Sequence, residues 1–270
     1  MKLLNPFLRL ASPAGRTGRL SVLIFHRVLP VSDPLFPAET DARRFAEVCG
    51  WLKSWFNVLP LDQAVSRLKA GSLPARAACI TFDDGYADNF QVAMPILRQY
   101  GLPATFFIAT GFLDGGRMWN DTIIEAVRGA TDPLLDLSSL NLGQHPVGTM
   151  AERRLTIGVL IDQIKYRPAV QRIGVTEQIA RLARVQLPQD LMMTSPQVKS
   201  MHQAGMQIGA HTVSHPILAQ LTDDQAKGEI SKSKTFLERL LDERVGLFAY
   251  PNGKPGEDYV PQTVEVVRNL

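Results

Sequence analysis

The sequence predicts an α/β protein built around a parallel sheet. Short apolar runs rich in β-favouring residues recur along the chain, and most are followed by a segment whose apolar residues repeat at helical spacing. This alternation is typical of parallel strands joined by crossover helices. With 270 residues, 45% of them hydrophobic, the chain can form one large α/β domain or two small ones.

Three strands are predicted in the first half of the chain. They are the apolar runs at 21–25, 77–82 and 104–109. Apolar residues recur at helical spacing over 41–56, and a second helix is predicted over 61–70, so that two helices separate the first two strands. A further helix over 88–100, closed by Gly101, leads to the third strand.

The alternation stops over residues 111–194. Prolines interrupt this stretch, and its pattern is helical, with helices predicted at 121–129, 151–165 and 176–186. We expect an α-rich insertion in one βα loop, which could serve as a lid, as the wall of a substrate groove or as filler.

The alternation resumes after the insertion. Ser195 and Pro196 predict a helix start, with Ser195 as the N-cap, and Gly205 predicts its end. A fourth strand is predicted at 206–210.

The last part of the chain adds a strand between two helices. The spacing from Thr222 to Gln225 is that of a capping box and predicts the start of a long helix. A fifth strand is predicted at 245–250, and residues 261–270 have the pattern of one more helix.

Charge and cysteine usage bound the function. The net charge is +3, and the sequence has no run of five basic residues, so we expect no nucleic-acid partner. The two cysteines, Cys49 and Cys79, do not form a disulfide framework and are expected to be buried.

Residues 1–20 are predicted to form an N-terminal tail. Asn5, Pro6 and Arg9 interrupt its apolar residues, so no signal peptide is predicted, and no segment has the 18 apolar residues of a membrane span. The apolar residues of the tail could still contact a membrane surface or pack on the domain. We expect a cytoplasmic protein, with peripheral membrane contact as an alternative.

Two adjacent carboxylates, Asp83 and Asp84, directly follow the strand predicted at 77–82. Asp-Asp-Gly after a strand is by itself more often a turn, because Asp tolerates the geometry and Gly supplies a positive φ. However, parallel folds build their sites at the carboxyl ends of strands. Neighbouring carboxylates are also costly unless a cation or a proton is shared between them, so the pair indicates a metal site.

Two histidines, His211 and His215, follow the strand predicted at 206–210. Imidazoles at positions i and i+4 lie on one face of a helical turn and can bind one metal ion, although two surface histidines are an equally common outcome. With one carboxylate they leave coordination positions open, which fits catalytic zinc, or another divalent ion such as cobalt or nickel. The second carboxylate could then take a proton from an activated water.

The segments Ile80-Thr-Phe-Asp-Asp-Gly85 and His211-Thr-Val-Ser-His215 resemble the first two motifs of polysaccharide deacetylases, the NodB homology or carbohydrate esterase family 4 proteins. Residues 20–265 are similar to that family in the order of their elements, including an opening strand that runs into His26-Arg27-Val28. The resemblance implies a distorted (β/α) barrel and hydrolysis of an N-acetyl, less often an O-acetyl, group on a sugar.

The resemblance also implies roles for individual residues. The metal ligands would be Asp84, His211 and His215. Asp83 would be the general base. Phe248-Ala-Tyr-Pro-Asn-Gly253 is similar to the third motif, in which the backbone N–H of the residue after the proline, here Asn252, would help to hold the oxyanion. His26 is expected near the site, or in the core beside it.

Two features depart from the family's pattern. Ala249 stands where many members carry an arginine that orients the base. The family's later Leu-x-x-His motif, whose histidine is the general acid, would follow Leu270. We therefore expect the deacetylase domain, residues 21–270, to be cut short, without its last strands and its proton donor.

The main prediction is a metal-dependent hydrolase that removes N-acetyl groups from a sugar of a polysaccharide or glycan precursor. One alternative is a related metal-dependent amidase that acts on a formyl or cyclic-imide substrate. Another is a truncated homologue that binds metal with little activity. The sequence leaves the particular glycan and the oligomeric state open.

Overall fold

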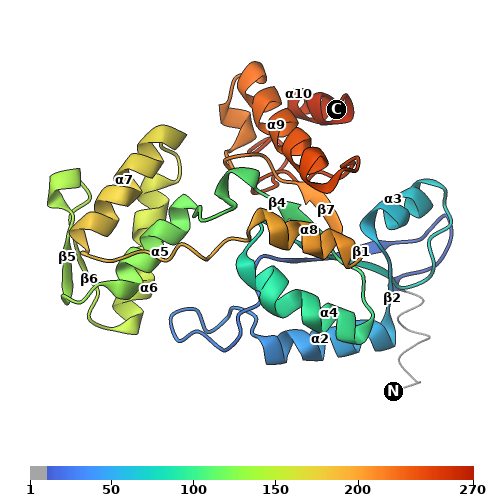
Figure 1. Cartoon of the computed structure of the whole chain (residues 1–270), viewed down its shortest axis with the longest axis horizontal. Helices are drawn as coiled ribbons and strands as arrows, with labels where there is room; N and C mark the ends of the chain where they lie inside the picture. The colour runs from blue at the N-terminus through green and yellow to red at the C-terminus, as the bar shows by residue number, and fades with distance from the viewer. Residues whose placement is uncertain (1–10) are drawn as a thin grey trace. The chain divides into compact units, whose positions relative to one another are not determined.

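The computed structural model describes residues 11–270 (Figure 1). The apolar residues of the expected tail, Leu3 to Leu10, lie outside the described residues. The chain divides into two compact units. The first contains residues 40–114 and 192–270 with the segment before residue 32, and the second contains 32–39 and 115–191. None of the helices within 11–270 combines the length and the apolar character needed to cross a bilayer.

The first unit is built on a five-stranded sheet. Its strands are β1 (Leu20–Phe25), β2 (Asn57–Val58), β3 (Ala77–Phe82), β4 (Thr105–Ile108) and β7 (Gln207–Ala210). The order is β1-β3-β4-β7, with β2 also paired to β3, and every pair is parallel. All residues of β3 and β4 are buried, as expected for strands covered on both faces. The predicted α/β class with a parallel sheet is confirmed.

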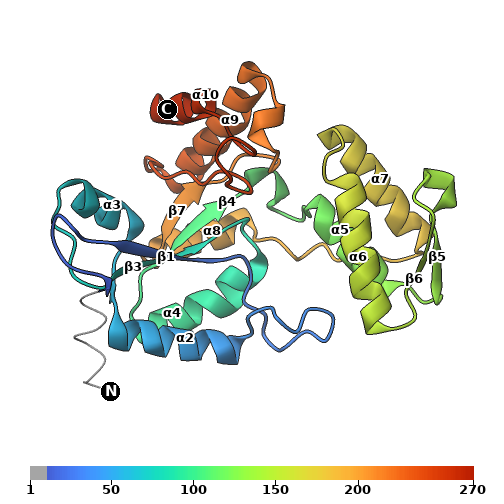
Figure 2. The ribbon, with the colours of Figure 1, turned by 180° about the vertical axis from the view of Figure 1, so that it is seen from behind.

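Helices cover this sheet. They are α2 (Ala42–Trp55), α3 (Leu61–Lys69), α4 (Met94–Tyr100), α8 (Ser195–Gln203) and α9 (Asp223–Leu241). Helix α10 (Pro261–Arg268) packs on α9. Helices α2 and α4 lie side by side (Figure 1, Figure 2). The fully buried ring of Phe45 on α2 packs edge-on against Phe82 of β3, with 5.7 Å between the ring centroids. Phe82 in turn stacks on Phe106 of β4, with 4.7 Å between the ring centroids. These rings anchor the helices to the strands that lead to the site.

Two of the helix starts follow from capping side chains. The capping box predicted at Thr222 is confirmed at the start of α9. At α8 the prediction was wrong by one residue, because Thr194 is the N-cap and Ser195 is the first helical residue. Gln197 lies three residues after Thr194, so that each side chain accepts from the other residue's backbone N–H.

The prediction of a strand at 245–250 was wrong. Within the described residues it forms one isolated parallel bridge, between Phe248 and Ala210. Ala249 N–H donates to the Ala210 carbonyl at 3.0 Å, but β7 ends there, and Thr212 turns the backbone away with φ of 67°. Pro251 has no N–H to extend a ladder on the other strand. A short contact replaces the expected strand.

The second unit contains three helices and a hairpin (Figure 2). These elements are α5 (Trp119–Gly129), β5 (Leu134–Asp136), β6 (Gln144–Pro146), α6 (Met150–Ile164) and α7 (Ala169–Leu182). The sequence did not predict the hairpin, whose strands have three residues each. Helix α7 begins seven residues earlier than the predicted 176, because Pro168 fits at a helix start. Ile123, Leu160 and Ile179 are fully buried and belong to a core within this unit.

Candidate metal centre

Asp83 and Asp84 lie at the carboxyl end of β3. Asp83 N–H donates to the Phe25 carbonyl at 2.9 Å, which continues the pairing with β1. Asp84 adopts a left-handed backbone with φ of 76°, and Gly85 follows with φ of 92°. Asp tolerates this conformation better than most residues, and Gly adopts it freely. The chain therefore turns sharply, and Asp84 is buried with a relative exposure of 5%.

His211 and His215 lie at the carboxyl end of β7. His211 N–H donates to the Ile108 carbonyl at 3.1 Å, so that His211 continues the pairing of β7 with β4. Thr212 and His215 both have positive φ, at 67° and 51°. The segment is therefore a tight loop and not a regular helical turn. Thr212 supports it, because its Oγ1 accepts from His215 N–H at 3.1 Å.

The two turns bring Asp84, His211 and His215 together. Asp84 Oδ1 lies 3.5 Å from His211 Nε2 and 3.4 Å from His215 Nε2. One ligand atom from each residue falls within 4.8 Å of the others. Asp84 Oδ1 is buried, and no hydrogen-bond partner meets it within the described chain. A buried carboxylate oxygen facing two imidazoles fits a divalent cation, because the cation would compensate its charge.

A hydrogen bond fixes the orientation of His211. Its Nδ1 donates to the Ala249 carbonyl at 2.9 Å. With that nitrogen protonated, the neutral ring carries its lone pair on Nε2, the atom that faces Asp84. Metal-binding histidines commonly donate their second ring nitrogen in this way. The sequence did not predict this role for Ala249, since a backbone carbonyl leaves no signal in the residue type.

The charges of the site shift its pKa values. Burial disfavours the ionised form of Asp84, but the close imidazole of His211 and the charge of His215 outweigh burial and lower the pKa of Asp84. Burial likewise opposes the charged form of His211, yet the nearby carboxylate of Asp84 and its negative charge raise the pKa of His211. Burial raises the pKa of Asp83; the charges of His211 and His26 oppose this shift, and that of Asp84 adds to it.

The two remaining residues singled out from the sequence lie in other segments of the chain. His26 is exposed at the end of β1, and its charge acts on both Asp83 and Asp84. Asn252 is exposed, with φ of 61°, in the turn after Pro251. Its backbone N–H donates to no other residue within 11–270, so it is available to an external acceptor.

Asp88 and Asn89, which the sequence analysis did not single out, hold the segment after β1. Asp88 accepts from Arg27 Nε at 2.8 Å and from Val28 N–H at 3.1 Å. Asn89 Nδ2 donates to the His26 carbonyl at 2.9 Å. Their place a few residues after Asp84 was the available signal, but the partners lie 60 or more residues away along the chain.

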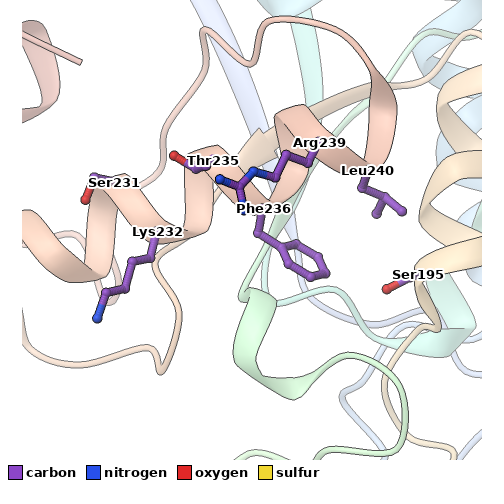
Figure 3. Close-up of a pocket in the computed structure, with 7 residues that line it drawn as sticks. All are labelled: Ser195, Ser231, Lys232, Thr235, Phe236, Arg239 and Leu240. Atoms are coloured by element: carbon purple, nitrogen blue, oxygen red, sulfur yellow. The ribbon is translucent and has the colours of Figure 1, made fainter.

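A hollow of about 720 Å³ lies between α9 and the start of α8 (Figure 3). Its lining residues are Ser195, Ser231, Lys232, Thr235, Phe236, Arg239 and Leu240. None of them is a member of the Asp84 cluster, so this hollow is separate from the candidate metal centre.

Comparison with protein families connects the site to a known group. The polysaccharide deacetylase family model matches residues 70–159 and 161–270, which is more than half of the chain. YxkH of Bacillus subtilis (strain 168), whose name places it among polysaccharide deacetylases, is 22% identical over 245 residues, which cover 90% of this chain and 60% of YxkH. The poly-beta-1,6-N-acetyl-D-glucosamine N-deacetylase of Staphylococcus aureus (strain MSSA476) is 39% identical over 69 residues. That match covers 25% of this chain and 24% of the relative.

Solved structures share the fold. The Streptococcus pyogenes deacetylase PplD, in complex with acetate, superposes with a TM-score of 0.58 at 21% identity, over 93% of this chain and 79% of PplD. IcaB from Ammonifex degensii gives a TM-score of 0.58 at 20% identity, over 96% of this chain and 81% of IcaB. The parallel-sheet α/β fold matches these structures, and it is consistent with the distorted barrel expected from the motifs.

Proposed function

Since the chain belongs to the polysaccharide deacetylase family of hydrolases, we propose that it removes N-acetyl groups from a sugar of a polysaccharide or glycan precursor in a metal-dependent reaction. The observation that carries the proposal is the cluster of Asp84, His211 and His215, with Asp83 directly beside it at the end of β3. The chain spans 60% of YxkH, so the activity of a whole relative is a proposal for this chain.

Three side chains would hold the ion, and one would handle the proton. Asp84, His211 and His215 would bind a divalent metal, which in such a site activates water and polarises the acetyl carbonyl. Asp83 would accept the proton of the attacking water as its oxygen bonds to the carbonyl carbon. Burial raises the pKa of Asp83, which suits a carboxyl group that keeps this proton until the leaving nitrogen takes it. As the nitrogen takes the proton, the bond between it and the acetyl carbon would break, which releases acetate and a free sugar amine.

Backbone and charge would complete the site. The N–H of Asn252 could donate to the oxygen that becomes negative as water adds to the carbonyl. His26, exposed at the end of β1, would favour the ionised form of Asp83 through its charge when protonated. Asn252 would therefore stabilise the negative oxygen, and His26 would influence the protonation of Asp83. Neither residue would bind the metal.

We propose zinc as the ion and an N-acetylated hexosamine as the sugar. Two imidazoles and one carboxylate, with open positions, form a donor set common to catalytic zinc, and cobalt or nickel would also fit it. The matched segment of the Staphylococcus aureus relative supports a substrate that carries N-acetylglucosamine, since that protein is named a poly-beta-1,6-N-acetyl-D-glucosamine N-deacetylase.

Acetate release tests this proposal. The purified chain is incubated with N-acetylglucosamine oligomers, first as isolated, then with a chelator, and then with zinc added back. We expect acetate in the first and third reactions and none in the second. A panel of formamides and cyclic imides serves as the comparison. Turnover of these amides without turnover of any acetylated sugar would contradict the proposed substrate but not the metal site.

A further inference from the structure

The loop that carries two metal ligands has an unfavourable backbone. Thr212 and His215 adopt positive φ, a backbone conformation that residues other than glycine rarely adopt. The strands do not support the middle of this loop, because β7 ends at Ala210. Contacts from outside the sheet must therefore hold it in place.

Glu229 on α9 supplies such contacts. One carboxylate oxygen, Oε2, accepts from the backbone N–H groups of Val213 at 2.9 Å and Ser214 at 2.8 Å. The other, Oε1, accepts from Ser214 Oγ at 2.9 Å. Hydrogen bonds to a charged acceptor are stronger than neutral ones, and here both oxygens are used on two of the three residues between the histidines.

The opposite side of the loop is also held. Thr110 N–H donates to the Thr212 carbonyl at 3.1 Å, and Gly111 N–H donates to the Val213 carbonyl at 2.8 Å. These donors belong to the 3₁₀ turn Thr110–Phe112, which follows β4. The turn after β4 therefore binds the loop's carbonyl groups, and Glu229 binds its N–H groups.

Within residues 11–270, the Glu229 carboxylate forms no hydrogen bond outside this loop. It is half-buried, and within residues 11–270 its carboxylate forms no ion pair with Lys, Arg or His. It does not belong to the cluster of metal-ligand atoms, and it does not line the hollow between α9 and the start of α8 (Figure 3). A half-buried carboxylate whose hydrogen bonds all go to one loop is best explained by that loop.

We propose that Glu229 is a positioning residue for the metal centre. Its carboxylate holds Val213 and Ser214 so that the imidazoles of both His211 and His215 lie against Asp84. This inference rests on the proposed metal-dependent function and adds to it a residue that fixes the ligand loop without touching the ion. Removing it would leave two backbone N–H groups without acceptors and let the loop relax from its left-handed conformation.

Metal affinity tests the proposal. Zinc dissociation constants are measured by competition with a chromophoric chelator for the unchanged chain, for Glu229→Ala and for Glu229→Gln. The Ala variant is expected to bind zinc about 10- to 100-fold more weakly, the usual effect of losing a group that orients metal ligands. The Gln variant keeps one oxygen acceptor and is expected to lose less. Equal affinity in Glu229→Ala and the unchanged chain would overturn the proposal.

Glu238→Gln is a matched control on the same helix. Glu238 is also half-buried and accepts from a backbone N–H, that of Val245 at 3.1 Å, and it pairs with Lys234. Its contacts lie away from the histidine loop, so its substitution is expected to lower thermal stability without changing zinc affinity. If both variants lost affinity equally, the effect would be one of general stability, and the positioning role would be wrong.

A spectrum separates geometry from stability. With cobalt bound to saturation, the d–d absorption bands report the arrangement of the ligands. We expect the bands to shift in Glu229→Ala and to stay unchanged in Glu238→Gln. If Glu229→Ala does not fold, Glu229→Gln decides, and unchanged affinity and bands there would overturn the proposal. Absence of zinc and cobalt binding by the unchanged chain would instead contradict the proposed function, and the positioning role with it.

Discussion

The two segments that carry the candidate metal ligands are held in different ways. The carboxylate segment, Asp83–Asp84, ends β3, which pairs with β1 along its whole length and with β4 on its other side. The histidine loop, residues 211–215, ends β7, which pairs with β4 but meets an isolated bridge at Phe248 on its other side. The sheet therefore positions the aspartates, and contacts from outside the sheet, made by the Glu229 carboxylate and by the backbone of the turn after β4, position much of the histidine loop.

This difference predicts where each half of the site is vulnerable. Changes in the carboxylate segment should remove chemical groups and leave the geometry of the site intact, because the sheet holds the backbone. Changes around the histidine loop should alter geometry without removing any ligand. Four measurements test this distinction.

The largest effect is expected for Asp83→Asn. The amide keeps the shape of the side chain but cannot accept the proton, so deacetylation is expected to fall by about two to four orders of magnitude. Zinc affinity is expected to remain close to that of the unchanged chain, because Asp83 is not one of the clustered ligands. Acetate release and chelator competition measure the two quantities. Loss of zinc binding in this variant would show that Asp83 belongs to the metal site.

A smaller effect is expected for Gly111→Ala. A Cβ at this position would lie 2.7 Å from the Val213 carbonyl oxygen, so the histidine loop or the turn after β4 must shift. Zinc affinity is expected to fall by about tenfold although every ligand is still present. Chelator competition measures the change.

Gly228→Ala is the control for that substitution. Gly228 lies within α9, next to Glu229, and nothing lies within 4 Å of an added Cβ. Replacing a helical glycine with alanine is expected to stabilise the fold by roughly 0.5–1 kcal/mol and to leave zinc affinity unchanged. Reduced affinity in both variants would mean that the loop responds to any change nearby, and the distinction between the two segments would fail.

The pH dependence should respond to His26. Burial raises the pKa of Asp83, and the base is active when ionised, so activity is expected to fall as the pH drops through this raised pKa. The charge of His26 opposes the shift, and His26→Gln should therefore move the acidic limb of the kcat/KM profile to higher pH, by less than about one unit. An unchanged limb would separate His26 from the base.

The smallest effect is expected for the two cysteines, whose reactivity tests whether β3 and α2 open in the native protein. Burial raises the pKa of Cys79, within β3, to about 11, with a contribution from the charge of Asp62, and burial raises the pKa of Cys49 on α2 to about 12. Neither thiol should react with an aromatic disulfide reagent at pH 8 in the native protein, and both should react after unfolding. Rapid native reaction of Cys79 would mean that β3 opens.

The sequence predicted well the features that one segment determines by itself. The runs that became β1, β3, β4 and β7 are short and apolar, and the capping box at Thr222 needs only four residues. A site made by one carboxylate of the aspartate pair and the two histidines was predicted because parallel folds build their sites at the carboxyl ends of strands. The choice of Asp84 over Asp83 as the ligand came from the resemblance to the family.

The sequence did not predict features that depend on contacts between residues far apart along the chain. Whether residues 245–250 pair depends on how far β7 extends before Thr212 turns, and no local pattern encodes that overlap. Glu229 has the pattern of any half-buried acid on an amphipathic helix, and only the structure shows that its carboxylate accepts from the N–H groups of Val213 and Ser214. The hydrogen bond from His211 to the Ala249 carbonyl depends on the backbone alone.

We expect the two segments to form one metal site through Asp84. Isothermal titration with zinc tests it most directly, for the unchanged chain and for Asp84→Ala, with circular dichroism to verify that both are folded. We expect one ion bound per chain in the unchanged protein and none in the variant. Zinc binding by Asp84→Ala with the stoichiometry and affinity of the unchanged chain would contradict it.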